Sequence, residues 1–328
     1  MNLFKKIIPF MVLFLAACGT SNTEEGTTES LDVVTTFYPM YNFTENIVGT
    51  NGNVTALLGA GQDTHSYEPT PKDMAAIAEA DVFVYSSEYM ETWVPSVLET
   101  LSDSDVTVIN ASEGIPFYED DDADHGHDHD HDHEEDHAHD HDDEEEHHEG
   151  DGHNHAVDPH VWLDPVYAKQ MVETISATIQ SVDSENKMAY QENTAAYVEQ
   201  LEALDAEFQT AFQAADNRVF VVQHAAFGYL ARRYDLTEVS ISALTSNQEV
   251  SPAKLAEIGN FIKENDVEVI YYQDSGNNDL ATTLAKETDT ELGVLSAVEG
   301  ITKSDQEAGI DYLTIMHNNL EALKQTIN

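Results

Sequence analysis

Histidine is the residue type in this sequence best suited to chemistry near neutral pH, and its distribution is uneven. The chain has 16 His residues, and 12 of them fall within residues 125–155. There they alternate with acids, in the run "DHGHDHDHDHEEDHAHDHDDEEEHHEG" and just after it. The twelve are His125, His127, His129, His131, His133, His137, His139, His141, His147, His148, His153 and His155. Imidazole and carboxylate groups are common ligands of Zn²⁺, so this run offers many sets of two or three ligands.

The four remaining His residues are scattered: His65, His160, His224 and His317. His317 lies in the helical pattern "TIMHNNLEAL" and is expected to be a solvated helix residue. Each of the other three could be either a buried, hydrogen-bonded His or a metal ligand. The elements that position them decide between these possibilities.

From Leu31 onward, short β-branched runs alternate with longer amphipathic ones. Strands are predicted at 33–38, 54–58, 82–85, 106–110, 218–223, 237–242, 267–273 and 292–295. Helices are predicted near 40–48, 71–80, 93–101, 165–182, 184–215, 225–234, 252–264, 277–288 and 306–326. Thr70-Pro71 and Asp164-Pro165 each predict a helix start, with a polar N-cap followed by Pro. The alternation predicts two α/β halves with parallel sheets, joined by one long helix.

Three of the isolated histidines fall near the ends of these predicted elements. His65 lies in the loop after strand 54–58, His224 follows strand 218–223, and His160 precedes a helix start. Ligands collect outside the carboxyl ends of parallel strands, so these imidazoles could converge from both halves on one cleft. A fourth ligand would complete a tetrahedral site. Three acids near strand ends are candidates, and the pattern does not choose among them: Glu249, Asp274 and Glu299.

The first thirty residues are predicted to be an export signal followed by a tether. Lys5 and Lys6 precede the short apolar stretch "IIPFMVLFLAA", which is typical of a signal peptide over residues 1–17. "LAAC" resembles the lipobox of bacterial lipoproteins and predicts lipidation of Cys18, the single Cys of the chain. The polar stretch up to residue 30 is typical of a flexible tether. Disulfides and thiolate metal sites are excluded by the single Cys.

The charge of the chain excludes one class of partner. Its 63 acidic and 13 basic residues give a formal net charge of −50. Such a surface repels nucleic acid and attracts cations. A nucleic-acid partner is therefore not expected.

Several motifs together resemble a known family, the zinc-binding solute-binding lipoproteins of ABC importers (the ZnuA/AdcA type, family 9 of metal-specific binding proteins). They are "TTFYPMY", "HSYEPTP", "DPHVWLDP", "QHAAFGYLARRY", "LAKET" and "AGIDYLTIMHNNLEAL". They follow one another in order and cover nearly the whole chain after the tether. None of them is sufficient alone, but the combination is highly specific.

The resemblance implies two Rossmann-like α/β lobes, a rigid linking helix and one metal in the cleft between the lobes. We assign 31–183 to the N-terminal lobe, with a His-rich loop at 119–155, 184–215 to the linking helix, and 216–328 to the C-terminal lobe. Carried over by motif, the metal ligands are His65, His160, His224 and Glu299. The Glu299 motif, "AVEGIT", is the weakest of the four.

The ligand set favours zinc as the cargo. Three imidazoles and one carboxylate suit tetrahedral Zn²⁺, whereas relatives that bind manganese replace the third His with an acid. Manganese or another divalent metal remains the alternative. A zinc hydrolase is a further alternative if Glu299 is not a ligand, although no HExxH motif is present. We expect a binding protein rather than an enzyme, with a site closed by protein ligands and no substrate pocket.

The His-rich run is expected to act as an accessory to this site. Each zinc ion that it binds must order the chain, so its affinity should be lower than that of a preformed cleft. We expect it to gather or buffer zinc and pass it on. The expected partners are an ABC permease with its ATPase, and the membrane through the Cys18 lipid. We expect a monomer at the outer face of the cell membrane, in a Gram-positive envelope.

Overall fold

The first sheet of the computed structural model has four parallel strands in the order β2-β1-β3-β4. The structure describes residues 30–118, 157–244, 250–273 and 277–328. The strands are β1 (Leu31–Thr35), β2 (Gly52–Ala56), β3 (Val82–Tyr85) and β4 (Thr107–Asn110).

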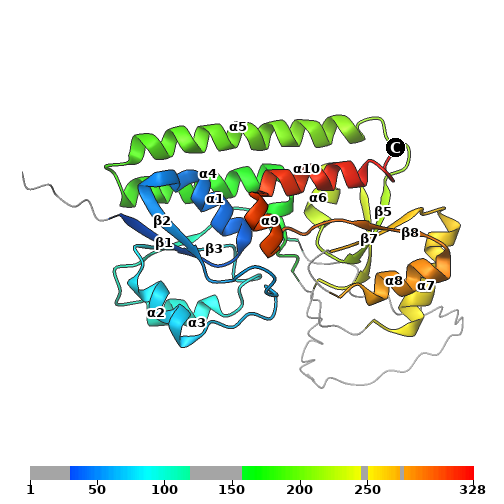
Figure 1. The fold of residues 1–328 in the computed structure, drawn as a ribbon, viewed down its shortest axis with the longest axis horizontal. Coiled ribbons are helices and arrows are strands. Elements are labelled where there is room, and N and C mark those ends of the chain that lie inside the picture. Colours follow the sequence, from blue (N-terminus) through cyan, green and yellow to red (C-terminus); the bar gives the residue numbers. More distant parts are fainter. Residues whose placement is uncertain (1–29, 119–156, 245–249, 274–276) are drawn as a thin grey trace, which may run out of the picture. The chain divides into compact units, whose positions relative to one another are not determined.

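Helices cover both faces of this sheet (Figure 1). In β3, Val82 and Val84 join the core beneath α1 (Tyr38–Val48) and α4 (Pro165–Val182). Phe83 and Tyr85 alternate with them and pack towards α2 (Pro71–Glu79) and α3 (Val94–Thr100). A strand buried on both faces needs apolar residues at every position, which explains the run "VFVY".

The second sheet repeats this design with strand order β6-β5-β7-β8, again all parallel. Its strands are β5 (Val219–His224), β6 (Thr237–Ser242), β7 (Val269–Tyr272) and β8 (Glu291–Val294). The helices α7 (Pro252–Glu264) and α8 (Asp279–Thr288) cover one face, and α6 (Gly228–Arg233) and α10 (Tyr312–Leu323) pack on the other. The carboxyl ends of parallel strands share one edge of each sheet.

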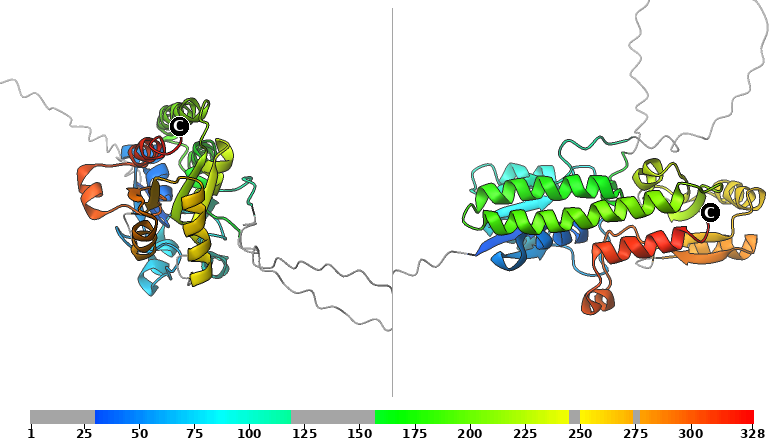
Figure 2. Two further views of the ribbon diagram at one scale, coloured as in Figure 1. Left: turned by 90° about the vertical axis from the view of Figure 1, so that its right-hand side faces the viewer. Right: turned by 90° about the horizontal axis from the view of Figure 1, so that it is seen from above.

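The long helix α5 (Lys187–Phe212) runs alongside α4 and past both sheets (Figures 1 and 2). Near the first sheet, the Tyr197 hydroxyl donates a hydrogen bond to Asn42 of α1 at 2.9 Å. Near the second, the Phe208 ring stacks on Tyr234 with centroids 5.1 Å apart. One continuous hydrophobic core extends through both sheets, and residues Leu31–Asn328 form one compact unit. The predicted α/β fold class is confirmed, while the lobe boundaries stay a prediction.

Both helix starts predicted from N-cap residues are confirmed. Thr70 and Asp73 form a reciprocal capping box at the start of α2. The Asp164 carboxylate accepts a hydrogen bond from the Val166 backbone at the start of α4. Within the described ranges, no helix is both long enough and apolar enough to span a membrane.

Two predicted elements are wrong in extent. The single helix expected at 306–326 is two helices, α9 (Lys303–Ala308) and α10. Gly309 ends the first with a φ of 72°, and Asp311 caps the second by accepting from the Thr314 backbone. The strand expected to reach residue 38 ends at Thr35, because Pro39 occupies the first turn of α1.

Candidate metal centre

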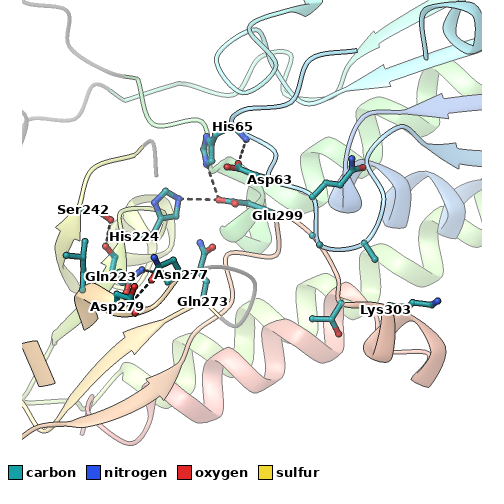
Figure 3. A pocket seen from close by; sticks show the side chains of 16 residues that line it. Asp63, His65, Gln223, His224, Ser242, Gln273, Asn277, Asp279, Glu299 and Lys303 are labelled. Carbon is teal, nitrogen blue, oxygen red and sulfur yellow. Dashed lines mark hydrogen bonds and ion pairs between the residues drawn. The ribbon is translucent and has the colours of Figure 1, made fainter. Parts of the chain in front are cut away.

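Four side chains from distant parts of the chain meet at the carboxyl edges of the two sheets. His224 is the last residue of β5, and Glu299 lies in the segment after β8. His65 lies in the loop after β2, and His160 immediately precedes the short helix η3 (Val161–Leu163). Figure 3 shows the His65 and His224 rings directed at the Glu299 carboxylate. The structure therefore brings together all four residues implied by the family resemblance.

The three distances from Glu299 to the histidines match the edges of a small coordination polyhedron. Glu299 Oε1 lies 3.2 Å from His65 Nε2, 3.1 Å from His160 Nε2 and 3.2 Å from His224 Nε2. One ligand atom from each of the four residues lies within 4.8 Å of the others. A tetrahedral ion with ligands at about 2.0 Å has ligand–ligand distances of about 3.3 Å. The observed spacing is therefore close to that required by Zn²⁺.

Hydrogen bonds on the far side of two imidazole rings orient their Nε2 lone pairs. His160 Nδ1 lies 2.8 Å from the Asp158 carboxylate, and His224 Nδ1 lies 3.2 Å from the Ala243 carbonyl oxygen. Both partners can only accept, so Nδ1 carries the proton and the Nε2 of the neutral ring carries a lone pair. These lone pairs face a carboxylate oxygen. The contacts are attractive only if a proton or a cation lies between nitrogen and oxygen.

Charge reinforces this preference for a cation. Burial would raise the pKa of Glu299, but hydrogen bonds with the three histidines hold its pKa well below the usual range. Burial lowers the pKa of His160, but its bonds with Asp158 and Glu299 outweigh burial and raise the pKa to about 9. With neutral imidazoles, the carboxylates of Asp158 and Glu299 give the site two negative charges. A divalent cation neutralises them.

Asp158 is a site residue that sequence reasoning missed. Its Oδ1 accepts from the His160 backbone N–H at 2.9 Å as well as from the ring. The signal was present in "DPH", where an Asp two residues before the His can form this turn. The same spacing occurs in Asp63-Thr64-His65, where Asp63 Oδ1 accepts from the His65 backbone at 2.9 Å. The spacing alone therefore does not separate the two aspartates.

His317 is not part of this centre. It lies on α10, with its side chain 46% exposed and paired to Glu207 at 3.2 Å, which agrees with the predicted solvated helix residue. Glu249 and Asp274, the other acids considered as fourth ligands, lie outside the described residues. So do Cys18 and the twelve histidines of the run.

A cavity of about 700 Å³ adjoins the centre, and the expectation of a site without a substrate pocket stays a prediction. Its lining includes His65, His224, Glu299, Gln223, Gln273 and Lys303. Figure 3 shows these side chains around it. It arises because the carboxyl edges of the two sheets face each other and their loops do not fill the space. The cavity therefore gives an ion access to the centre past polar side chains such as Gln223, Gln273 and Lys303.

Comparisons with known proteins agree on one family. Residues 33–326 match the family model described as zinc-uptake complex component A, periplasmic. The chain is 42% identical over 333 residues to the high-affinity zinc uptake system protein ZnuA of Bacillus subtilis (strain 168), covering 99% of both. It is 41% identical over 317 residues to the zinc-binding lipoprotein AdcA of Streptococcus pneumoniae serotype 4, covering 96% of this chain and 58% of AdcA.

A solved structure extends this similarity to the fold. The Zn(II)-bound ZnuA-like domain of Streptococcus pneumoniae AdcA superposes with a TM-score of 0.74 at 38% identity. The match covers 91% of this chain and 99% of that domain. The sequence similarity and the structural similarity thus each cover more than nine tenths of this chain.

Proposed function

Because the chain belongs to the family of periplasmic zinc-uptake components, we propose that it is the high-affinity zinc-binding component of an ABC importer. It binds Zn²⁺ outside the cytoplasm through His65, His160, His224 and Glu299. The observation that carries this assignment is the position of Glu299 Oε1, which lies within 3.2 Å of all three Nε2 atoms.

Zinc is favoured over manganese by the donor atoms. Three imidazole nitrogens and one carboxylate oxygen form the borderline-soft tetrahedral set that Zn²⁺ prefers. Mn²⁺ prefers sites richer in oxygen. The Bacillus subtilis and Streptococcus pneumoniae relatives are both named for zinc, which supports the same choice.

The residues around the ion have separate tasks in capture. Asp158 and the Ala243 carbonyl keep Nδ1 of His160 and His224 protonated, so that their Nε2 atoms are available to the metal. Any proton held between the histidines and Glu299 leaves when the ion enters. Metal binding therefore releases protons and weakens as the pH falls.

Delivery requires a membrane partner. In this proposal a lipid on Cys18 holds the protein at the outer face of the cell membrane, and a permease with its ATPase receives the ion. The His-rich run gathers zinc for the cleft. The lobe boundaries given above, a monomeric state, a Gram-positive envelope and the absence of catalytic activity belong to the same proposal.

Metal titrations of the full chain test the site. Wild type is compared with His224→Ala, Glu299→Ala and the matched control His317→Ala, which removes an isolated His on α10. His224→Ala and Glu299→Ala should weaken zinc binding beyond the ~10–100-fold typical of losing an outer-shell partner, while His317→Ala should bind as wild type. Wild-type affinity in His224→Ala would contradict the proposed site. Preference of the wild type for Mn²⁺ would contradict the proposed cargo.

The same variants test for catalysis. If Glu299 were a catalytic group rather than a ligand, the three histidines would hold the ion without it. Glu299→Ala would then keep tight zinc binding and alter hydrolysis of ester or peptide substrates. Loss of affinity without any hydrolysis, in either wild type or variant, is the result expected for a binding protein.

A further inference from the structure

The backbone around Glu299 is held at successive residues by distant elements. We call Ser296–Glu299 the Glu299 arm. Asn319 of α10 accepts from the Ser296 backbone N–H at 2.9 Å and donates to its carbonyl at 2.7 Å. The buried Trp162 indole N–H, in η3, donates to the Ala297 carbonyl at 2.8 Å. The arm is therefore tied to two elements before its carboxylate meets any ion.

Val298, directly before the ligand, has a backbone conformation that valine disfavours. Its φ is 55°, in the left-handed region, and its side chain is 1% exposed within the hydrophobic core. The other non-glycine residues with positive φ in the described ranges are all aspartates: Asp235, Asp266 and Asp289. Asp tolerates this region, whereas a β-branched residue there is a true outlier.

Such a conformation persists only where the surroundings enforce it. Here the buried Val298 side chain anchors the turn, and the Ser296 hydroxyl accepts from the Val298 backbone N–H at 3.2 Å. Because residue 298 cannot relax towards its preferred extended region, the next residue is directed at the three histidines. The strained residue thus lies where it fixes the direction of a ligand.

We propose that Val298 is a positioning residue that makes Glu299 a rigid ligand through Oε1 and thereby favours Zn²⁺ over Mn²⁺. Zn²⁺ accepts four ligands in a fixed tetrahedron. Mn²⁺ gains from extra oxygen donors, which a mobile carboxylate supplies by turning both oxygens to the ion. Rigidity of the arm therefore acts against Mn²⁺. This inference rests on the proposed function, because it concerns the same ion site.

The test compares Val298→Gly with wild type and with Asp289→Gly. Glycine accepts positive φ without strain but lacks the buried anchor and samples many backbone conformations. Asp289 has a φ of 59° at the end of α8, before β8 begins, so Asp289→Gly is the same backbone change at the opposite end of that strand. Zinc and manganese affinities are measured by chelator competition, and Co²⁺ absorption spectra report coordination number.

Val298→Gly should bind zinc about 10-fold more weakly, the lower end of the effect of losing outer-shell support, with manganese affinity retained. Its ratio of zinc to manganese affinity should fall. The absorption bands of Co²⁺ bound to the variant should be weaker than in wild type, as expected when the ion gains ligands. Asp289→Gly should match wild type in the affinity ratio and in the Co²⁺ spectrum. Val298→Ala, which keeps a Cβ in the core, should shift the ratio in the same direction by less.

A wild-type ratio and spectrum in both Val298 variants would overturn the inference. So would an equal shift in Asp289→Gly. Failure of the proposed function is a different result, namely zinc affinity that does not change in His224→Ala or Glu299→Ala.

Discussion

Replacing Asp158 with Asn should weaken zinc binding although Asp158 need not touch the ion. Its Oδ1 lies 2.8 Å from His160 Nδ1 and it carries one of the two carboxylate charges of the centre. Asn keeps the size and an accepting oxygen, so the ring orientation survives while the charge is lost. The site then has one negative charge to balance a divalent ion, and the His160 nitrogen becomes a weaker donor.

The expected loss is about 10–100-fold in zinc affinity, which is about 1.4–2.8 kcal/mol at 1.4 kcal/mol per factor of ten. Competition with a chelator of known affinity, at constant pH and ionic strength, measures it.

The chain offers a matched control in Asp63→Asn. Asp63 accepts from the backbone N–H of His65 at 2.9 Å, as Asp158 does from that of His160. Asp158 additionally bonds the imidazole ring, and Asp63 is exposed. Asp63→Asn should therefore change affinity by less than about 3-fold, since exposed charges are screened. Equal losses in the two variants, or less than about 3-fold in Asp158→Asn, would refute the charge argument.

Three further predictions concern stability and the His-rich run. Burial raises the pKa of Glu91 from 4.5 to about 7; because the folded pKa exceeds the unfolded one, the Glu91 contribution to stability is full below pH ~4.5 and falls by about 3 kcal/mol as the pH rises through ~7. Between pH 5 and pH 8, urea unfolding should show a fall in stability that is about 2–3 kcal/mol larger in wild type than in Glu91→Gln, since burial also raises the pKa of Glu238 to about 8 and its share of the fall remains in the variant; parallel profiles would contradict the prediction. Arg233→Ala should lower stability by about 1–3 kcal/mol, since it leaves the buried Asp164 carboxylate, 2.8 Å away, without its cation while Arg233 itself is a third exposed; Arg232→Ala is the control, and equal unfolding midpoints would count against the ion pair. Deleting 121–155 should leave one tight zinc site and remove several weak ones in a calorimetric titration, whereas loss of the tight site would mean that the ligand set is wrong.

The elements of this fold were predictable where the signal is local. Thr70 and Asp164 mark helix starts through contacts within three residues, so a short stretch of sequence contains the whole cause. The missed break between α9 and α10 was also local. Gly309 followed by Asp311 is a stop and a new N-cap, and the apolar periodicity of the following helix concealed it.

The fourth ligand could not be selected from the residues alone. Glu249, Asp274 and Glu299 all follow predicted strands, and the family motif supplied the choice. In the structure Glu299 is directed inward by long-range contacts, such as the bond from Trp162 to Ala297 across 135 residues. No periodicity or spacing encodes such a contact. Likewise, Asp63 and Asp158 each accept from the backbone of the His two residues later, and this spacing does not reveal that Asp158 also bonds the imidazole ring.

The net charge of the whole chain acts on cations over long distances, whereas the choice between cations is made by the ligand cluster at short distances. The net charge of −50 attracts every cation alike, and salt screens it beyond about 8–10 Å. It can raise the local supply of metal but cannot distinguish Zn²⁺ from Mg²⁺ or Mn²⁺. Discrimination must therefore arise within the 4.8 Å cluster, from nitrogen donors whose protons are fixed and from a carboxylate whose backbone is held. Neutralising surface acids should then slow zinc association while leaving the zinc-to-manganese affinity ratio unchanged, whereas changes at Asp158 or Val298 act on the site itself.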